Sequence, residues 1–110
     1  MKLELRNVIE ALAPFNTLDT SMQVSTVLTL LEVAKAEASG EEIGVGEIAK
    51  RVGLHSGTAS RNVAYWAKGA PNISAAHDYV RIDFHSTDRR LRSLSLTPKG
   101  KAFVKQITGE

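Results

Sequence analysis

Residues 45–69 read VGEIAKRVGLHSGTASRNVAYWAKG, a stretch that predicts two short helices joined by a tight turn. The apolar side of the first helix, over residues 45–52, consists of Ile48, Ala49 and Val52. Gly53 can adopt the left-handed conformation that a tight turn requires, and Leu54 follows as the apolar plug of the turn. Ser56 is a candidate N-cap for a second helix over residues 57–68. Together these elements form the helix-turn-helix pattern.

The second helix has two chemically different sides. Its buried side is predicted to consist of Ala59, Val63 and Trp66, at spacing i, i+4 and i+7. In a helix-turn-helix the second helix enters the major groove of duplex DNA, where Arg pairs with guanine and Asn with adenine. The residues from which we predict DNA contacts are Ser56, Thr58, Ser60, Arg61, Asn62 and Tyr65. The alternative is that these polar side chains only solvate a surface helix.

A two-stranded hairpin is predicted to follow. YVRIDFH (residues 79–85) alternates, with Val80, Ile82 and Phe84 on one side, and a second strand over residues 91–96 turns Leu94 and Leu96 inward. A helix-turn-helix followed by such a hairpin is a winged helix, so the fold class is mainly α with a small β-hairpin. At or beside the hairpin tip, where they suit the narrow and negative minor groove, stand Arg89, Arg90 and Arg92.

Three more helices complete the predicted domain. The first covers residues 2–13 and is expected to end at Pro14. The second ends near residue 38, before Gly40, and has Asp19, Thr20 and Ser21 as possible N-caps. The last covers residues 98–108, with Thr97 as N-cap and Pro98 at the first helical position.

The two terminal helices carry more apolar side chains than the winged core needs. Exposed apolar surface of this kind marks association sites, so we expect a two-fold homodimer. The residues expected at its interface are Leu5, Val8, Ile9, Leu12, Phe103 and Ile107. The alternative is that both helices fold back on their own core.

Composition narrows the classes of function. The chain has 110 residues, enough for one small domain, and it contains no cysteine. No stretch is long and apolar enough for a membrane helix or a signal peptide, so we expect a cytoplasmic protein without membrane contact. The histidines His55, His77 and His85 are not at metal-ligand spacing, and no base and acid accompany the serines. We therefore expect no metal, no cofactor and no enzymatic activity.

Charge is unevenly distributed along the chain. Residues 1–50 contain four Lys and Arg against eight Asp and Glu, whereas residues 51–110 contain ten against four. The second part therefore has a charge of +6, although the whole chain has only +2. A basic half of this kind is typical of a protein that binds a polyanion.

The segment STDRRLRSLSLTPKG (residues 86–100) resembles the wing signature of the MarR family of transcriptional regulators. The positions that match are Asp88, Arg90, Leu96, Thr97, Pro98 and Gly100. GEIAKRVGLHSGTASRNV (residues 46–63) is similar to the helix-turn-helix of the family, and the whole resemblance covers about residues 22–107. It implies that Asp88 braces the wing through an arginine, that Arg89 or Arg90 enters the minor groove, and that residues 58–62 read bases.

The chain also differs from typical members of this family. They have a longer N-terminal segment and two C-terminal helices that join a dimer, whereas one short helix follows Pro98 here. Ligand pockets of the family lie between the dimerisation helices and the winged domain, so this difference argues against a small-molecule effector. The short form resembles compact versions that are encoded by bacteriophages.

The sequence therefore predicts a winged-helix protein that binds double-stranded DNA in a sequence-specific manner and regulates transcription. Repression by occlusion of a promoter is the mechanism that we expect. The alternative function is that of a protein-interaction module, because winged helices can bind other proteins, such as a subunit of a host RNA polymerase.

Overall fold

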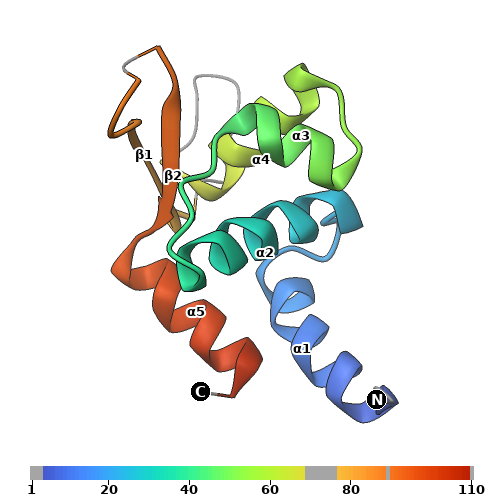
Figure 1. The fold of residues 1–110 in the computed structure, drawn as a ribbon. Coiled ribbons are helices and arrows are strands. Elements are labelled where there is room, and N and C mark those ends of the chain that lie inside the picture. The colour runs from blue at the N-terminus through green and yellow to red at the C-terminus, as the bar shows by residue number, and fades with distance from the viewer. Residues whose placement is uncertain (1–3, 69–76, 89, 110) are drawn as a thin grey trace.

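The computed structural model describes residues 4–68, 77–88 and 90–109. Its elements are, in chain order, α1 (Leu5–Leu18), α2 (Val24–Ala38), α3 (Val45–Val52), α4 (Ser56–Trp66), β1 (Val80–Phe84), β2 (Arg92–Leu96) and α5 (Pro98–Thr108). Figure 1 shows α2 in the middle of the molecule, with the hairpin, α3 and α4 towards one end and the terminal helices α1 and α5 at the other. The predicted fold class, mainly α with one β-hairpin, is confirmed.

The core forms where α2 meets the helix-turn-helix and the hairpin. Leu30 and Val33 of α2, Ile48 of α3 and Trp66 of α4 have no exposed side-chain surface in this core. The three predicted residues on the inner side of α4 are all buried, which confirms that part of the sequence pattern: Ala59, Val63 and Trp66. Trp66 is fixed further because its indole Nε1 donates to the carbonyl oxygen of Thr26 in α2 at 2.7 Å.

The hairpin is antiparallel, and its register places the apolar residues of both strands on one face. Val80 pairs with Leu96 and Ile82 with Leu94, while Phe84 lies opposite Arg92. A third segment joins this sheet through a single bridge between Ile43 and Leu94. The wing is therefore attached to the loop between α2 and α3 by the main chain.

Three predicted helix boundaries are wrong. Ser56, the predicted N-cap of the second helix of the helix-turn-helix, is the first residue of α4, and His55 is the N-cap. Pro14 was expected to end the first helix but lies inside α1, which continues to Leu18. The last turn persists because Phe15 is 3% exposed and packs edge-on against Phe103, with ring centroids 5.1 Å apart. The cap of α2 is also different, since the helix begins at Val24 after Gln23 rather than after residues 19–21.

The last helix begins as predicted. The hydroxyl of Thr97 accepts a hydrogen bond from the amide of Gly100 at 3.0 Å, and Pro98 occupies the first helical position. Gly100 is buried against the chain entering β1, where an added Cβ would lie 2.1 Å from the carbonyl oxygen of Tyr79. In the part of the chain that the structure describes, no helix is long and apolar enough to cross a bilayer.

Candidate nucleic-acid interface

The turn between α3 and α4 has the geometry that the sequence predicts. Gly53 has a φ of 83°, in the left-handed region, and its amide donates to the carbonyl oxygen of Ala49 at 2.9 Å. The amide of Leu54 donates to the same carbonyl at 2.9 Å, and its half-buried side chain packs against the core. These bonds end α3 and redirect the chain into α4, so the orientation of α4 relative to α3 is fixed locally.

Asn62 was expected on the exposed side of α4, and this expectation is wrong. Its side chain is buried, with 9% exposed. Its Nδ2 donates to the hydroxyl of Thr29 at 3.3 Å, and its Oδ1 accepts from the hydroxyl of Thr26 at 3.3 Å. The amide thus satisfies two buried hydroxyls of α2, and it holds α4 to the core instead of facing solvent.

Tyr65 also contacts the protein's own interior. Its hydroxyl donates to Oδ2 of Asp19 at 2.7 Å, and its ring lies edge-on to Trp66 with centroids 5.2 Å apart. This hydrogen bond lowers the pKa of Asp19, and burial together with the same bond raises the pKa of Tyr65. Tyr65 therefore connects the second half of α4 to the link between α1 and α2, and its hydroxyl is engaged within the chain.

The first half of α4 remains open to solvent. The five residues there that are exposed are Ser56, Gly57, Thr58, Ser60 and Arg61. They occupy the side opposite Ala59 and Val63, which are buried. This surface combines one guanidinium group with three hydroxyls, so it can both donate and accept hydrogen bonds.

The wing tip contains a brace of the kind that the family resemblance implies. Oδ1 of Asp88 accepts from the main-chain amide of Arg90 at 3.0 Å and from its Nε at 3.1 Å. Oδ2 of Asp88 accepts from the second guanidinium nitrogen, also at 3.0 Å. These bonds with Arg90 lower the pKa of Asp88 and keep its carboxylate charged. Arg89, also predicted to contact DNA, lies outside the described residues.

Arg92 stands on the outer part of the hairpin, and its guanidinium lies over the ring of Phe84 at 4.4 Å from the centroid. This cation–π contact holds the guanidinium group of Arg92 against the apolar face of the wing. Phe84 and Ile82 remain 61% and 44% exposed, although they share that face with the buried Val80. The core therefore covers only the base of the hairpin and leaves its outer part accessible.

The carboxylates that hold these elements together were not singled out from the sequence. Arg51 of α3 pairs with Glu41 and, at 3.0 Å, with Glu47, and its Nη1 lies 3.6 Å from Oε1 of Glu32 in α2. The spacing of Glu47 and Arg51, i and i+4 on one helix, is a signal that could have identified this pair. Glu37 of α2 accepts from the amide of Leu96 at 2.8 Å and so fixes the base of β2.

The terminal surface agrees with the predicted dimer interface only in part. Leu5, Ile9 and Leu12 of α1 are 79%, 66% and 47% exposed, whereas Val8 is partly covered. Phe103, expected at the interface, is 7% exposed because it packs on Phe15 within the same chain. Among the other predicted interface residues, Ile107 packs partly against the core. The predicted interface residues that remain exposed therefore lie on the outer side of α1.

The three histidines occupy three different environments. His55 is exposed ahead of α4, and His85 lies 3.6 Å from Glu42. His77 packs between the rings of Tyr65 and Tyr79, and burial lowers its pKa. Among the described residues no three His, Cys, Asp or Glu side chains are grouped as metal ligands would be.

No protein-family model and no curated protein sequence matches this chain. Solved structures do match its fold. A mutant of MepR from S. aureus, bound to an oligodeoxyribonucleotide, has a TM-score of 0.71 at 17% identity over 94% of this chain and 67% of the other. YusO from Bacillus subtilis has a TM-score of 0.66 at 16% identity, covering 94% and 64%. The transcriptional regulator Tm0710 from Thermotoga maritima has a TM-score of 0.68 at 16% identity, covering 94% and 63%.

These neighbours are MarR-family winged-helix regulators, and the resemblance predicted from the sequence is confirmed at the level of the fold. The chain spans less than two thirds of the length of YusO and of Tm0710. Because the identities are below one fifth, the likeness establishes the architecture and leaves the activity to be argued from the surface itself.

Proposed function

We propose that this protein is a sequence-specific regulator of transcription that binds double-stranded DNA. The observation that carries the proposal is the joint position of two surfaces. The exposed first half of α4 and the arginine-bearing hairpin lie towards the same end of the molecule, away from the terminal helices (Figure 1). A recognition helix and a wing on one side can engage the major groove and the adjacent minor groove together.

In this proposal α4 reads the bases. Arg61 can bind the O6 and N7 atoms of a guanine, and Thr58 and Ser60 can donate to or accept from neighbouring base edges. Ser56, at the start of α4, would contact a phosphate, since helix N-termini favour anions. The buried partners of Asn62 and Trp66 supply the rigidity that such base reading requires.

The wing supplies charge. Arg90 is 89% exposed at the side chain even though it pairs with Asp88, so its remaining donors are available to phosphate oxygens or to the minor groove. Arg92 adds a second guanidinium on the same hairpin, next to the exposed ring of Phe84. Both residues therefore act mainly on affinity and position, while α4 determines sequence preference.

A homodimer is the form that we propose for the DNA-bound protein. The exposed apolar side of α1, formed by Leu5, Ile9 and Leu12, lies at the end of the molecule opposite the wing. Pairing of two such helices about a two-fold axis would leave both α4 surfaces free to contact two half-sites. Bound at a promoter, such a dimer would repress transcription by excluding the polymerase.

The test measures how DNA affinity changes with salt concentration, both for the unmutated protein and for a variant that carries Arg90→Ala and Arg92→Ala. The proposal expects strong salt dependence, and a slope shallower by about one to two units in the variant, because each lost phosphate contact removes ~0.9. An unchanged slope in the folded variant would show that the wing does not belong to the DNA interface. Absence of duplex binding even at low salt would refute the function and favour the protein-interaction module.

The dimer is tested by Ile9→Glu, which places a charge in the centre of the exposed side of α1. Light scattering should show a dimeric mass for the unmutated protein on DNA and a monomeric mass for the variant. A monomeric mass for the unmutated protein, both alone and on DNA, would contradict the dimer.

A further inference from the structure

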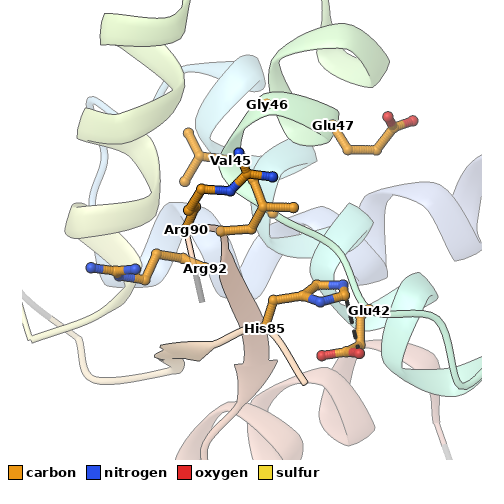
Figure 2. Close-up of a pocket in the computed structure, with 9 residues that line it drawn as sticks. Glu42, Val45, Gly46, Glu47, His85, Arg90 and Arg92 are labelled. Carbon is orange, nitrogen blue, oxygen red and sulfur yellow. Dashed lines mark ion pairs between the residues drawn. The ribbon is translucent and has the colours of Figure 1, made fainter. Parts of the chain in front are cut away.

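The turn that follows β1 is tied to the loop that precedes α3 through one carboxylate. Oε2 of Glu42 accepts from the main-chain amide of Ser86 at 3.1 Å, and Oε1 accepts from the hydroxyl of the same serine. The Nε2 atom of His85 lies 3.6 Å from Oε1 of Glu42, as the dashed line in Figure 2 marks. Glu42 therefore contacts two successive residues of the wing that are more than forty positions away in the sequence.

The loop that carries Glu42 is itself fixed. Ile43, the next residue, is 1% exposed, and its carbonyl oxygen accepts from the amide of Leu94 at 2.9 Å. Gly44 then begins the approach to α3, and a Cβ at this position would lie 2.9 Å from the carbonyl oxygen of Arg92. Glu42 thus stands on a rigid segment that leads directly into the helix-turn-helix.

Two carboxylates add side-chain attachments to the main-chain bridge between Ile43 and Leu94. Glu37 of α2 holds the base of β2 through the amide of Leu96. Glu42 holds the outer turn, beside the pocket that Arg90 and Arg92 line together with the first turn of α3 (Figure 2). The part of the hairpin beyond the Ile43–Leu94 bridge could still swing, and the contact between Glu42 and Ser86 restricts that movement relative to the helix-turn-helix.

We propose that Glu42 is a positioning residue for DNA binding, which fixes the wing arginines relative to α4 through Ser86 and His85. The inference rests on the proposed function, since it assigns a partner to the same surface. The inference predicts a change in DNA affinity whose sign is opposite to that of a purely electrostatic effect. A carboxylate beside a DNA-binding surface repels phosphates, so its removal should strengthen binding if charge were its only effect. A positioning role requires the opposite result.

The hydrogen bonds from Ser86 lower the pKa of Glu42, and His85 adds a smaller effect in the same direction. The side chain therefore remains an acceptor for both donors of Ser86 at neutral pH. Ser86 and Glu42 are exposed, so the pair stabilises the position of the turn more than the fold as a whole.

The experiment compares Glu42→Ala and Glu42→Gln with a matched control, Asp83→Asn, which removes one negative charge from the same hairpin. Asp83 pairs with Arg81 of its own strand. The DNA probe is a duplex selected from a random pool by the unmutated protein. Nuclear magnetic resonance measures hydrogen exchange of the Ser86 amide in each variant without DNA, and the fluorescence of Trp66 verifies folding.

Glu42→Ala should weaken binding to the selected duplex by about 3- to 10-fold, the range for loss of one or two modest hydrogen bonds, and should speed exchange at Ser86. Glu42→Gln removes the same charge but keeps an acceptor, so it should bind more tightly than Glu42→Ala. Asp83→Asn should bind as tightly as the unmutated protein or more tightly. If Glu42→Ala binds the selected duplex as tightly as the unmutated protein does, or more tightly, the proposal is overturned.

The proposed function and the positioning role of Glu42 can be refuted by different results. If the unmutated protein selects no duplex, the proposed function fails and Glu42 loses its role with it, whatever the exchange rates. If a duplex is selected and Ser86 exchange is unchanged in Glu42→Ala, the proposed function survives and the positioning role is refuted.

Discussion

Substitution of Asn62 by alanine distinguishes a base-reading side chain from one that holds α4 to the core. The variant loses two side-chain hydrogen bonds, both at 3.3 Å, to the hydroxyls of Thr26 and Thr29. A neutral hydrogen bond stabilises a protein by about 0.5–1.5 kcal/mol. The hydroxyl of Thr29 keeps a second partner, the carbonyl oxygen of Ser25 at 2.8 Å, which limits the loss at that site. The expected decrease in the free energy of unfolding is therefore about 1–2 kcal/mol.

Urea unfolding measures this change, with the fluorescence of Trp66 as the signal because it is the single tryptophan and is fully buried. A loss of 1 kcal/mol corresponds to a melting temperature lower by about 4–8 °C in a domain of nearly this size. Ser60→Ala on the exposed side of α4 is the matched control and should change stability by less than about 0.5 kcal/mol. Unchanged stability of Asn62→Ala, combined with an altered base preference, would refute the assignment of Asn62 to the core.

Two further predictions concern packing and titration. Gly100→Ala should destabilise the protein by about 1–3 kcal/mol in the same urea assay, because its Cβ would overlap the carbonyl oxygen of Tyr79. Gly46→Ala, which meets nothing within 4 Å on α3, should be neutral or stabilising, and equal effects of the two changes would contradict the predicted crowding. The pKa of Asp88 should lie below its ordinary value and return towards it in Arg90→Ala, as followed by carboxyl resonances. The pKa of Asp88 is lower in the folded protein than in the unfolded chain. The contribution of the Asp88–Arg90 pair to stability is therefore present above the unfolded-state pKa of Asp88, and it is lost as the pH falls through the folded-state pKa.

The sequence contained the local features of the fold. Gly53 indicated the turn of the helix-turn-helix, and the spacing of Thr97, Pro98 and Gly100 indicated the start of α5, because each depends only on neighbouring residues. The position of Pro14 was misjudged for the opposite reason. Burial of Phe15 against a helix at the other end of the chain outweighs the missing hydrogen bond of a proline, and no local pattern reports such a contact.

The candidate site, like the fold, could be predicted from the sequence only in part. Arg61 and Thr58 are exposed as expected, since they lie opposite the apolar side of α4. Asn62 was misplaced because polar residues were taken to face outward, although positions 59, 62, 63 and 66 follow the i, i+3, i+4, i+7 spacing of a buried side. Glu42 could not have been found from the sequence, because its partner Ser86 is separated from it by 44 positions.

Selection of bound duplexes from a random pool tests the central claim most directly. The unmutated protein should enrich one sequence, arranged as two related half-sites if the dimer is correct. Arg61→Ala should then lose about 1–3 kcal/mol of affinity for that sequence and far less for random DNA, as expected for a base contact. Failure to enrich any sequence, or an equal loss on selected and random duplexes, would contradict sequence reading by α4.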